Sequence, residues 1–213
     1  MKHSFEIKVC GINDQISMNV ALNMGVNYIG LVFYDKSPRN LSITNAKSLT
    51  KNRTNKSKIV ALTVNPDDIF LREIRNHIKP DYIQLHGGET PNRCTNIKDK
   101  FNIPIIKGIG IKNNIDLNKY IKPYAEICDI LILDAPSEEL PGGNGKKFDW
   151  GILKNYKLKK KWMLAGGLDI NNISEAIHIT KPPAIDISSG LEKNKGTKDP
   201  QLIKNFVLKC RSL

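Results

Sequence analysis

The sequence predicts an α/β protein whose strands and helices alternate along the chain and close into a single (β/α)8 barrel. Short β-branched runs recur at intervals of about 20–30 residues, and segments with helical periodicity separate them. No stretch of the 213 residues has the composition of a linker, so we expect one domain over residues 1–213. Strict alternation implies parallel strands with helices covering them.

Eight short apolar runs have the length expected of buried strands. They are Ile7–Cys10, Tyr28–Phe33, Lys58–Val64, Tyr82–Leu85, Ile103–Ile109, Ile130–Leu133, Trp162–Ala165 and Ala184–Ile187. Eight strand–helix units in one uninterrupted chain fit a closed TIM barrel better than an open sheet.

The segments between these strands repeat apolar residues at helical spacing. Asn65-Pro66-Asp67 and Asp169-Ile170-Asn171 supply start signals, because Asn and Asp side chains accept the free N–H groups of a first helical turn. The expected helices are Asp14–Met24, Thr44–Asn52, Asp67–Ile78, Thr90–Phe101, Asn114–Ile121, a short one near Asp149–Lys154, Asn171–Thr180 and Pro200–Cys210.

An open, doubly wound sheet is the alternative architecture. It would carry a G-x-G-x-x-G turn after the first strand. The first turn here reads Cys10-Gly11-Ile12-Asn13, and the glycines gather late instead, at 142–145, 166–167 and 190. The barrel is therefore favoured.

Composition excludes several classes of protein. The chain is 40% hydrophobic and 25% charged, which suits a folded core, and no apolar run approaches the roughly 18–20 residues of a membrane span. The net charge of +12 comes mainly from lysines spread along the chain. The one basic run, Lys157–Lys161, has no interleaved aromatic residues, so we expect a solvated surface and no nucleic-acid partner.

The four cysteines (Cys10, Cys94, Cys128 and Cys210) lie far apart and form no C-x-x-C pair. This spacing argues against a zinc site or a disulfide framework and fits a reducing cytoplasm. The N-terminus shows no signal peptide, so we expect a cytoplasmic protein.

Polar residues share one parity along several of the expected strands and gather toward strand ends. They are Lys8 and Cys10, Gln84 and His86, Lys107, Asp134, and Asp186 with Ser188. Such a set is costly in a core but sensible at the mouth of a barrel active site. Lys8 shares a face with Cys10, and a nearby cation favours a thiolate. Asp134 as a loop cap and His86 as a core histidine remain open alternatives.

Two glycine loops indicate a phosphate site. Leu164-Ala165-Gly166-Gly167-Leu168 follows the seventh strand, and Ser188-Ser189-Gly190 follows the eighth. In barrels these two loops commonly bind phosphate through backbone N–H groups.

A set of motifs in order along the chain resembles the phosphoribosylanthranilate isomerase family of tryptophan biosynthesis. The motifs are Lys8-Val9-Cys10-Gly11-Ile12, Ser37-Pro38-Arg39, Gln84-Leu85-His86-Gly87, Leu133-Asp134, Gly142-Gly143-Asn144-Gly145 with Phe148-Asp149-Trp150, Leu164-Ala165-Gly166-Gly167-Leu168, Asp186-Ile187-Ser188-Ser189-Gly190-Leu191-Glu192 and Gly196-Thr197-Lys198-Asp199. One departure is Asn144, where the family usually has Thr.

The resemblance implies an Amadori rearrangement of N-(5-phosphoribosyl)anthranilate by general acid–base catalysis. It implies Asp134 as the acid, Cys10 as the base and Arg39 as the partner of the anthranilate carboxylate. The other substrate-binding residues it implies are Lys8, His86 and Asp186, and for the phosphate Gly143, Gly145, Gly166, Gly167, Ser189 and Gly190. We expect a monomer acting on a small-molecule substrate, with no metal or cofactor.

Three other functions remain as alternatives. Another phosphate-binding barrel, such as indole-glycerol-phosphate synthase or triosephosphate isomerase, would carry Lys/Glu or His/Glu sets at the strand ends, and these are not found. A basic nucleic-acid-binding protein would not require Cys10. A pseudoenzyme with an intact phosphate site is disfavoured, because both expected catalytic residues are present.

Overall fold

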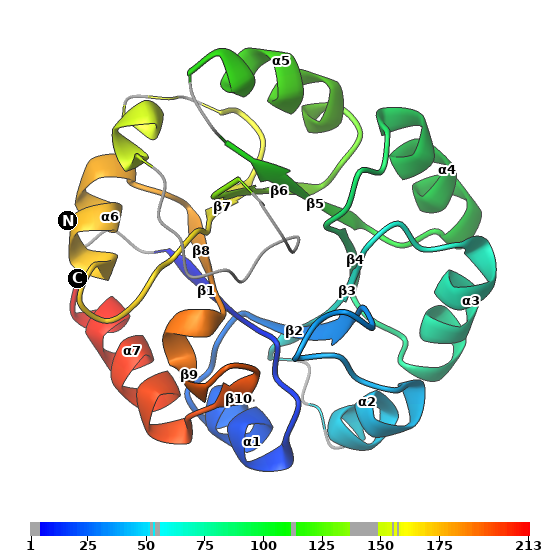
Figure 1. The fold of residues 1–213 in the computed structure, drawn as a ribbon, viewed down its shortest axis with the longest axis horizontal. Helices are drawn as coiled ribbons and strands as arrows, with labels where there is room; N and C mark the ends of the chain where they lie inside the picture. The colour runs from blue at the N-terminus through cyan, green and yellow to red at the C-terminus, as the bar shows by residue number, and fades with distance from the viewer. Residues whose placement is uncertain are drawn as a thin grey trace.

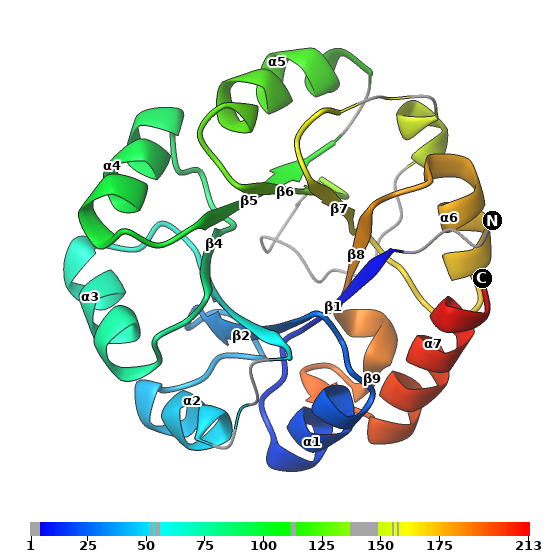
Figure 2. The ribbon, with the colours of Figure 1, turned by 180° about the vertical axis from the view of Figure 1, so that it is seen from behind.

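Eight parallel strands form a closed barrel whose order around the ring is their order along the chain (Figures 1 and 2). The computed structural model describes residues 5–51, 53, 56–111, 114–136, 149–154, 156 and 158–213. The strands are β1 (Glu6–Cys10), β2 (Tyr28–Phe33), β3 (Lys58–Thr63), β4 (Tyr82–Leu85), β5 (Ile105–Gly110), β6 (Ile130–Asp134), β7 (Trp162–Leu164) and β8 (Ala184–Ile187). The predicted fold class is confirmed.

Helices surround the ring of strands on its outside (Figure 1). They are α1 (Gln15–Asn23), α2 (Ile43–Thr50), α3 (Asp68–His77), α4 (Pro91–Phe101), α5 (Asn114–Ala125), α6 (Ile173–Thr180) and α7 (Pro200–Ser212), with a 3-10 turn, η1 (Trp150–Leu153), between β6 and β7. Several begin after a polar cap: the side chains of Asp14, Asp67 and Thr90 accept backbone N–H groups of the first turn. The predicted helix near Asp149–Lys154 is thus a single 3-10 turn.

The alternating parity of the strands separates two apolar layers. Residues such as Val9 and Leu31 face outward and pack with helix residues such as Met18 in the larger core. Residues of the opposite parity, such as Ile106 and Ile130 near the first residues of their strands, pack together inside the ring. Apolar side chains therefore fill the amino-terminal part of the barrel interior, and the polar side chains lie toward its carboxyl end.

A short antiparallel hairpin follows the last barrel strand and was not predicted. A 3-10 turn, η2 (Ser189–Leu191), leads from β8 into β9 (Glu192–Asn194), which pairs with β10 (Thr197–Lys198). Strands of three and two residues carry too little alternation to be recognised in a sequence.

Glu192 joins this hairpin to the loop after β2. Nε and Nη2 of Arg39 donate to the two carboxylate oxygens of Glu192 at 2.6 and 2.9 Å. Nζ of Lys198 lies 2.7 Å from Oε1 of the same carboxylate. The three side chains are only 7%, 5% and 0% exposed, so this is a buried network in which two cations share one anion.

The network lowers the pKa of Glu192. Burial alone would raise this pKa, but the hydrogen bonds and charges of Arg39 and Lys198 outweigh it and lower the pKa from 4.5 to about 2. A depressed carboxyl pKa means that ionised Glu192 stabilises the fold above about pH 4.5. That contribution is lost as the pH falls through about 2.

No helix in the described residues is long and apolar enough to cross a membrane.

We expect Glu192→Gln to lower the free energy of unfolding at neutral pH by on the order of 3 kcal/mol, because it leaves two buried cations without their anion. The variant should also lose part of the fall in stability that the unmodified protein shows between about pH 4.5 and 2. Urea unfolding at several pH values measures both effects. Glu175→Gln, at an exposed position of α6, is the matched control. An unchanged pH slope in the Glu192 variant would contradict the assigned role of the carboxylate.

Candidate active site

Side chains from four strands meet at the carboxyl end of the barrel. Cys10 ends β1, Asp134 ends β6, His86 directly follows β4, and Asp186 is the third residue of β8. Because all eight strands are parallel in one closed ring, these ends lie at the same rim. The polar positions that the sequence placed on one parity are therefore brought together, with the exception of Lys107.

Lys8 and Asp186 form a buried ion pair between the first and last strands. The two residues are direct partners in the β1–β8 register, and Nζ of Lys8 lies 2.8 Å from Oδ1 of Asp186. The Lys8 side chain is 0% exposed. Burial alone would lower the pKa of Lys8, but Asp186 and Cys10 outweigh it and raise the pKa above its usual value. Lys8 is therefore a fixed cation in the interior of the barrel.

Cys10 lies against this pair, and its thiol is less acidic than the sequence suggested. Burial is the largest effect and raises the pKa of Cys10, while the charge of Lys8 lowers it and that of Asp186 raises it. Lys8 favours the thiolate, as expected, but burial outweighs it and the net direction is upward. Lys8 works against burial, and Asp186 cancels part of its field.

A glycine on the neighbouring strand makes room for the thiol. A Cβ atom at Gly30 of β2 would lie 2.7 Å from Sγ of Cys10. Any side chain at this position would displace the sulfur. A lone glycine inside an expected strand gives no such signal in a sequence, since it more commonly marks a bulge or a bend.

His86 lies between Asp134 and Gln84. Nε2 of His86 is 3.4 Å from Oδ2 of Asp134, and its Nδ1 is 2.9 Å from the amide nitrogen of Gln84. The other carboxylate oxygen of Asp134 accepts a hydrogen bond from the N–H of Ala135 at 2.7 Å. A Cβ atom at Gly108 of β5 would lie 2.2 Å from Nδ1 of His86, so this strand also leaves a space for a site side chain.

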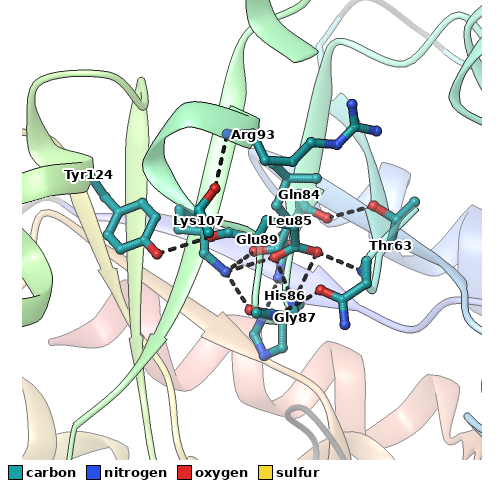
Figure 3. A network of polar contacts seen from close by, with 12 residues as sticks. Thr63, Gln84, Leu85, His86, Gly87, Glu89, Arg93, Lys107 and Tyr124 are labelled. Carbon is teal, nitrogen blue, oxygen red and sulfur yellow. Dashed lines mark hydrogen bonds and ion pairs between the residues drawn. The ribbon is translucent and has the colours of Figure 1, made fainter. Parts of the chain in front are cut away.

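Lys107 does not point into the barrel. Its neighbours Ile106 and Gly108 take the interior positions of β5, and Lys107 faces outward to a buried ion pair with Glu89, whose Oε2 is 2.9 Å from Nζ (Figure 3). Nζ also donates to the carbonyl oxygens of Leu85 and Gly87. The expectation that Lys107 belongs to the polar set at the barrel mouth is wrong.

This ion pair instead fixes the loop after β4. Glu89 accepts hydrogen bonds from the N–H groups of Gly87 and Asn65, and its carbonyl oxygen accepts one from the Tyr124 hydroxyl (Figure 3). Because Gly87 directly follows His86, the network holds the backbone from which the His86 ring projects. Glu89 was not singled out from the sequence.

Arg39 lies near the rim, in the two-pronged contact with Glu192 described above. Its stem passes over Gly11, where a Cβ atom would lie 2.5 Å from Cδ of Arg39. The contact with an anthranilate carboxylate stays a prediction. Glu192 and Lys198 are site-adjacent residues that sequence reasoning missed as a pair, although both stand within motifs that carry the resemblance.

The two glycine loops pack closely against each other. Gly166 and Gly167 have φ angles of +88° and +64°, which favour glycine. A Cβ atom at Gly190 would lie 2.1 Å from the carbonyl oxygen of Leu168, so only glycine fits there. Within the described part of the chain, the N–H groups of Gly167, Ser189 and Gly190 donate to no protein acceptor. Gly143 and Gly145 lie outside the described residues.

Comparison with known proteins identifies the family. Residues 7–209 match the family model described as N-(5'phosphoribosyl)anthranilate (PRA) isomerase. The chain is 42% identical over 206 residues to the N-(5'-phosphoribosyl)anthranilate isomerase of Brucella canis (strain ATCC 23365 / NCTC 10854 / RM-666), a match that covers 95% of this chain and 92% of that protein.

Solved structures show the same likeness. The phosphoribosyl anthranilate isomerase of Thermotoga maritima superposes with a TM-score of 0.88 at 29% identity, covering 99% of this chain and all of that one. A phosphoribosyl anthranilate isomerase in complex with reduced 1-(o-carboxyphenylamino)-1-deoxyribulose 5-phosphate superposes with a TM-score of 0.86 at 28% identity, with the same coverage. The chain therefore belongs to the N-(5'-phosphoribosyl)anthranilate isomerase family, whose members are isomerases of tryptophan biosynthesis.

Proposed function

We propose that this isomerase of tryptophan biosynthesis rearranges N-(5'-phosphoribosyl)anthranilate with Asp134 as the general acid and Cys10 as the general base. The observation that carries the proposal is the placement of a thiol and a carboxyl at the same rim of the barrel, on strands β1 and β6. With β7 and β8 between them, the two groups can approach a bound substrate from different sides.

The chemistry needs one proton donor and one proton acceptor. Asp134 gives its proton to the furanose ring oxygen, the C1–O bond breaks, and the nitrogen lone pair forms an iminium. Cys10 then removes the proton from C2, and the electrons of that C–H bond move into the iminium to give an enolamine. Tautomerisation of the enolamine gives the aminoketose, so atoms and electrons balance without an external oxidant or reductant.

The raised pKa of Cys10 has a consequence for this mechanism. A thiol that is protonated at neutral pH must first lose its proton before it can act as the base. Lys8 lies against the sulfur as a fixed cation and stabilises the thiolate once it forms, while Asp186 keeps Lys8 in place. This assigns to Lys8 and Asp186 a supporting part beneath the reacting atoms.

The two anionic ends of the substrate need separate partners. The guanidinium of Arg39 suits the anthranilate carboxylate, because its planar donors match a carboxylate in pairs, and Glu192 fixes its orientation. The backbone N–H groups of Gly167, Ser189 and Gly190 suit the 5'-phosphate. A relative's complex with a reduced product analogue supports a ligand of this kind. Phosphate contacts from Gly143 and Gly145 remain predictions.

The chain is also proposed to act as a monomer in the cytoplasm. Among the described residues, the large apolar side chains that are exposed, namely Ile16, Ile69, Tyr120 and Leu208, lie on four different helices, α1, α3, α5 and α7. A solved relative from Thermotoga maritima is described as dimeric. Light scattering should report one chain of 23.9 kDa, and a mass of two chains would contradict the proposal.

We expect Cys10→Ser to lower kcat by about 10²–10⁴-fold with KM little changed, because a serine hydroxyl is un-ionised where a thiolate is needed. In the unmodified enzyme kcat/KM should fall at both ends of the pH range, at low pH because the Cys10 thiol keeps its proton and at high pH because Asp134 has lost the proton it must donate. Loss of substrate fluorescence, with the product removed by an excess of the next enzyme, measures both. Cys210→Ser, a buried thiol on α7, is the control. Near-normal turnover in the Cys10 variant would remove it from the mechanism.

We expect Asp134→Asn to lower kcat by orders of magnitude while the product analogue still binds, because the amide has no transferable proton and the groups at the two ligand ends are untouched. Stability should stay within about 1 kcal/mol, since the amide oxygen can still accept from Ala135.

The matched control is Asp129→Asn, just before the same strand. Asp129 accepts hydrogen bonds from the N–H of Ile105 and from Lys98, so its loss should cost stability and leave kcat alone. If Asp134→Asn behaved like Asp129→Asn, Asp134 would be a structural residue and not the acid.

A further inference from the structure

Gln84, His86 and Asp134 form a line of polar groups across the rim. The amide nitrogen of Gln84 lies 2.9 Å from Nδ1 of His86, and Nε2 of His86 lies 3.4 Å from Oδ2 of Asp134. Gln84 is 0% exposed and lies on β4, two residues before His86, so the two side chains share the interior face of that strand (Figure 3). The His86 contact with Asp134 is longer than an ordinary hydrogen bond, as is common for catalytic contacts before a substrate binds.

The Gln84 contact fixes which ring nitrogen carries the hydrogen. A neutral imidazole has one donor nitrogen and one acceptor nitrogen. The amide nitrogen of Gln84 can only donate, so its contact with Nδ1 is a hydrogen bond only in the tautomer whose hydrogen is on Nε2. That N–H faces the Asp134 carboxylate, whereas the other tautomer would place a lone pair against it.

Burying the Gln84 amide destabilises the fold, and its contact with His86 is the interaction that accounts for an amide at this position. Its oxygen, Oε1, is buried and has no hydrogen-bond partner among the described residues. A buried polar atom without a partner destabilises a fold, and an apolar side chain of the same size would avoid that cost. The one side-chain hydrogen bond that the amide makes in the described part of the chain is the one to His86.

The His86 ring has little freedom to turn away. It lies against the backbone of β5 at Gly108, where a Cβ atom would come within 2.2 Å of Nδ1. The backbone N–H of His86 donates to the carbonyl oxygen of Thr63 at 2.9 Å, and the Lys107–Glu89 pair holds the backbone of Gly87, the following residue. A held ring with a set tautomer offers a fixed donor at one point of the rim.

Asp134 thus has a nitrogen near each carboxylate oxygen. The N–H of Ala135 donates to Oδ1 at 2.7 Å, and Nε2 of His86 lies 3.4 Å from Oδ2, within ion-pair distance. When an acid has given up its proton, donors that are already in place stabilise the carboxylate that remains without reorganising.

We propose that Gln84 is a positioning residue for proton transfer at Asp134. Gln84 keeps the His86 hydrogen on Nε2, and this hydrogen donates to the carboxylate that remains after Asp134 has protonated the substrate. The part that concerns proton transfer rests on the proposed role of Asp134, and the part that concerns the tautomer does not.

The tautomer is measured by NMR on protein with 15N-labelled histidine. Long-range 1H–15N spectra distinguish a protonated from an unprotonated ring nitrogen, and His86→Asn identifies the His86 signals among the four histidines. We expect Nδ1 to be unprotonated in the unmodified protein and the preference to be lost in Gln84→Met, which conserves volume. A hydrogen on Nδ1, or an unchanged preference in Gln84→Met, would overturn the proposal.

Kinetics tests the second part. We expect Gln84→Met to lower kcat on the order of 10-fold with KM near its normal value, as is typical of partners that orient a functional histidine. In the Asp134→Asn background the same change should add no further loss, because Gln84 then has no acid to act through. An equal, additive loss in both backgrounds, or no loss in either, would overturn the positioning role.

Thr63→Val is the matched control. The Thr63 hydroxyl donates to the carbonyl oxygen of Gln84, so its removal disturbs the same pair of strands without touching the amide or the ring. It should lower the melting temperature and leave both the His86 tautomer and kcat unchanged. If Thr63→Val shifted both of these as Gln84→Met does, a general loosening of β4 would explain the data and the proposal would fall. A full loss of kcat in Gln84→Met beside normal turnover in Asp134→Asn would instead identify a failure of the acid role itself.

Discussion

The ion pair between Lys8 and Asp186 is the contact on which the polar carboxyl end of the barrel depends. An ammonium group with no exposed surface cannot keep its charge without an anion beside it, and Asp186 is placed opposite Lys8 by the register of β1 and β8. The contact that seals the ring therefore also puts a positive charge below Cys10. Either residue without the other would leave an unpaired charge in the interior. Closure of the barrel between β1 and β8 and the charge beside Cys10 therefore both require this ion pair.

Similar buried pairs recur around this rim, each joining one segment to the next. Lys107 and Glu89 hold the loop from which His86 projects, and Glu192 joins Arg39 to the hairpin after β8. The opposite half of the barrel interior is filled by apolar side chains. The buried ion pairs of the barrel thus lie toward the end proposed as the active site, and apolar side chains fill the other half of its interior.

The sequence predicts the barrel well because the alternation of strands and helices is a repeated local pattern. Alternation along the strands also places Lys8, Cys10, Gln84, His86 and Asp186 on the interior face, because two polar residues at alternate positions of one strand mark the same face. It fails for Lys107 because a single polar residue in a strand does not reveal its face, and the residues before and after it proved to be the interior ones. Parity depends on register, which pairing with the neighbouring strands decides.

The rest of the site escapes sequence reasoning for a different reason. Gly30 and Gly108 matter because of what occupies the space beside them, the Cys10 sulfur and the His86 ring, and that space is defined only in three dimensions. The partnership of Glu192 with Arg39 spans 153 positions and uses a hairpin too short to leave a periodic pattern.

The great sequence separation of these contacts determines when the site can exist during synthesis of the protein. Lys8 and Asp186 are 178 positions apart, so a growing chain releases its first strand long before the partner of Lys8 has been made. Until β8 emerges from the ribosome, the lysine of β1 has no anion to pair with and must keep its ammonium group in water. The carboxyl-end rim is thus among the last parts of the molecule to form, and a chain released before Ala184 would have neither a closed ring nor the Lys8–Asp186 pair beside Cys10.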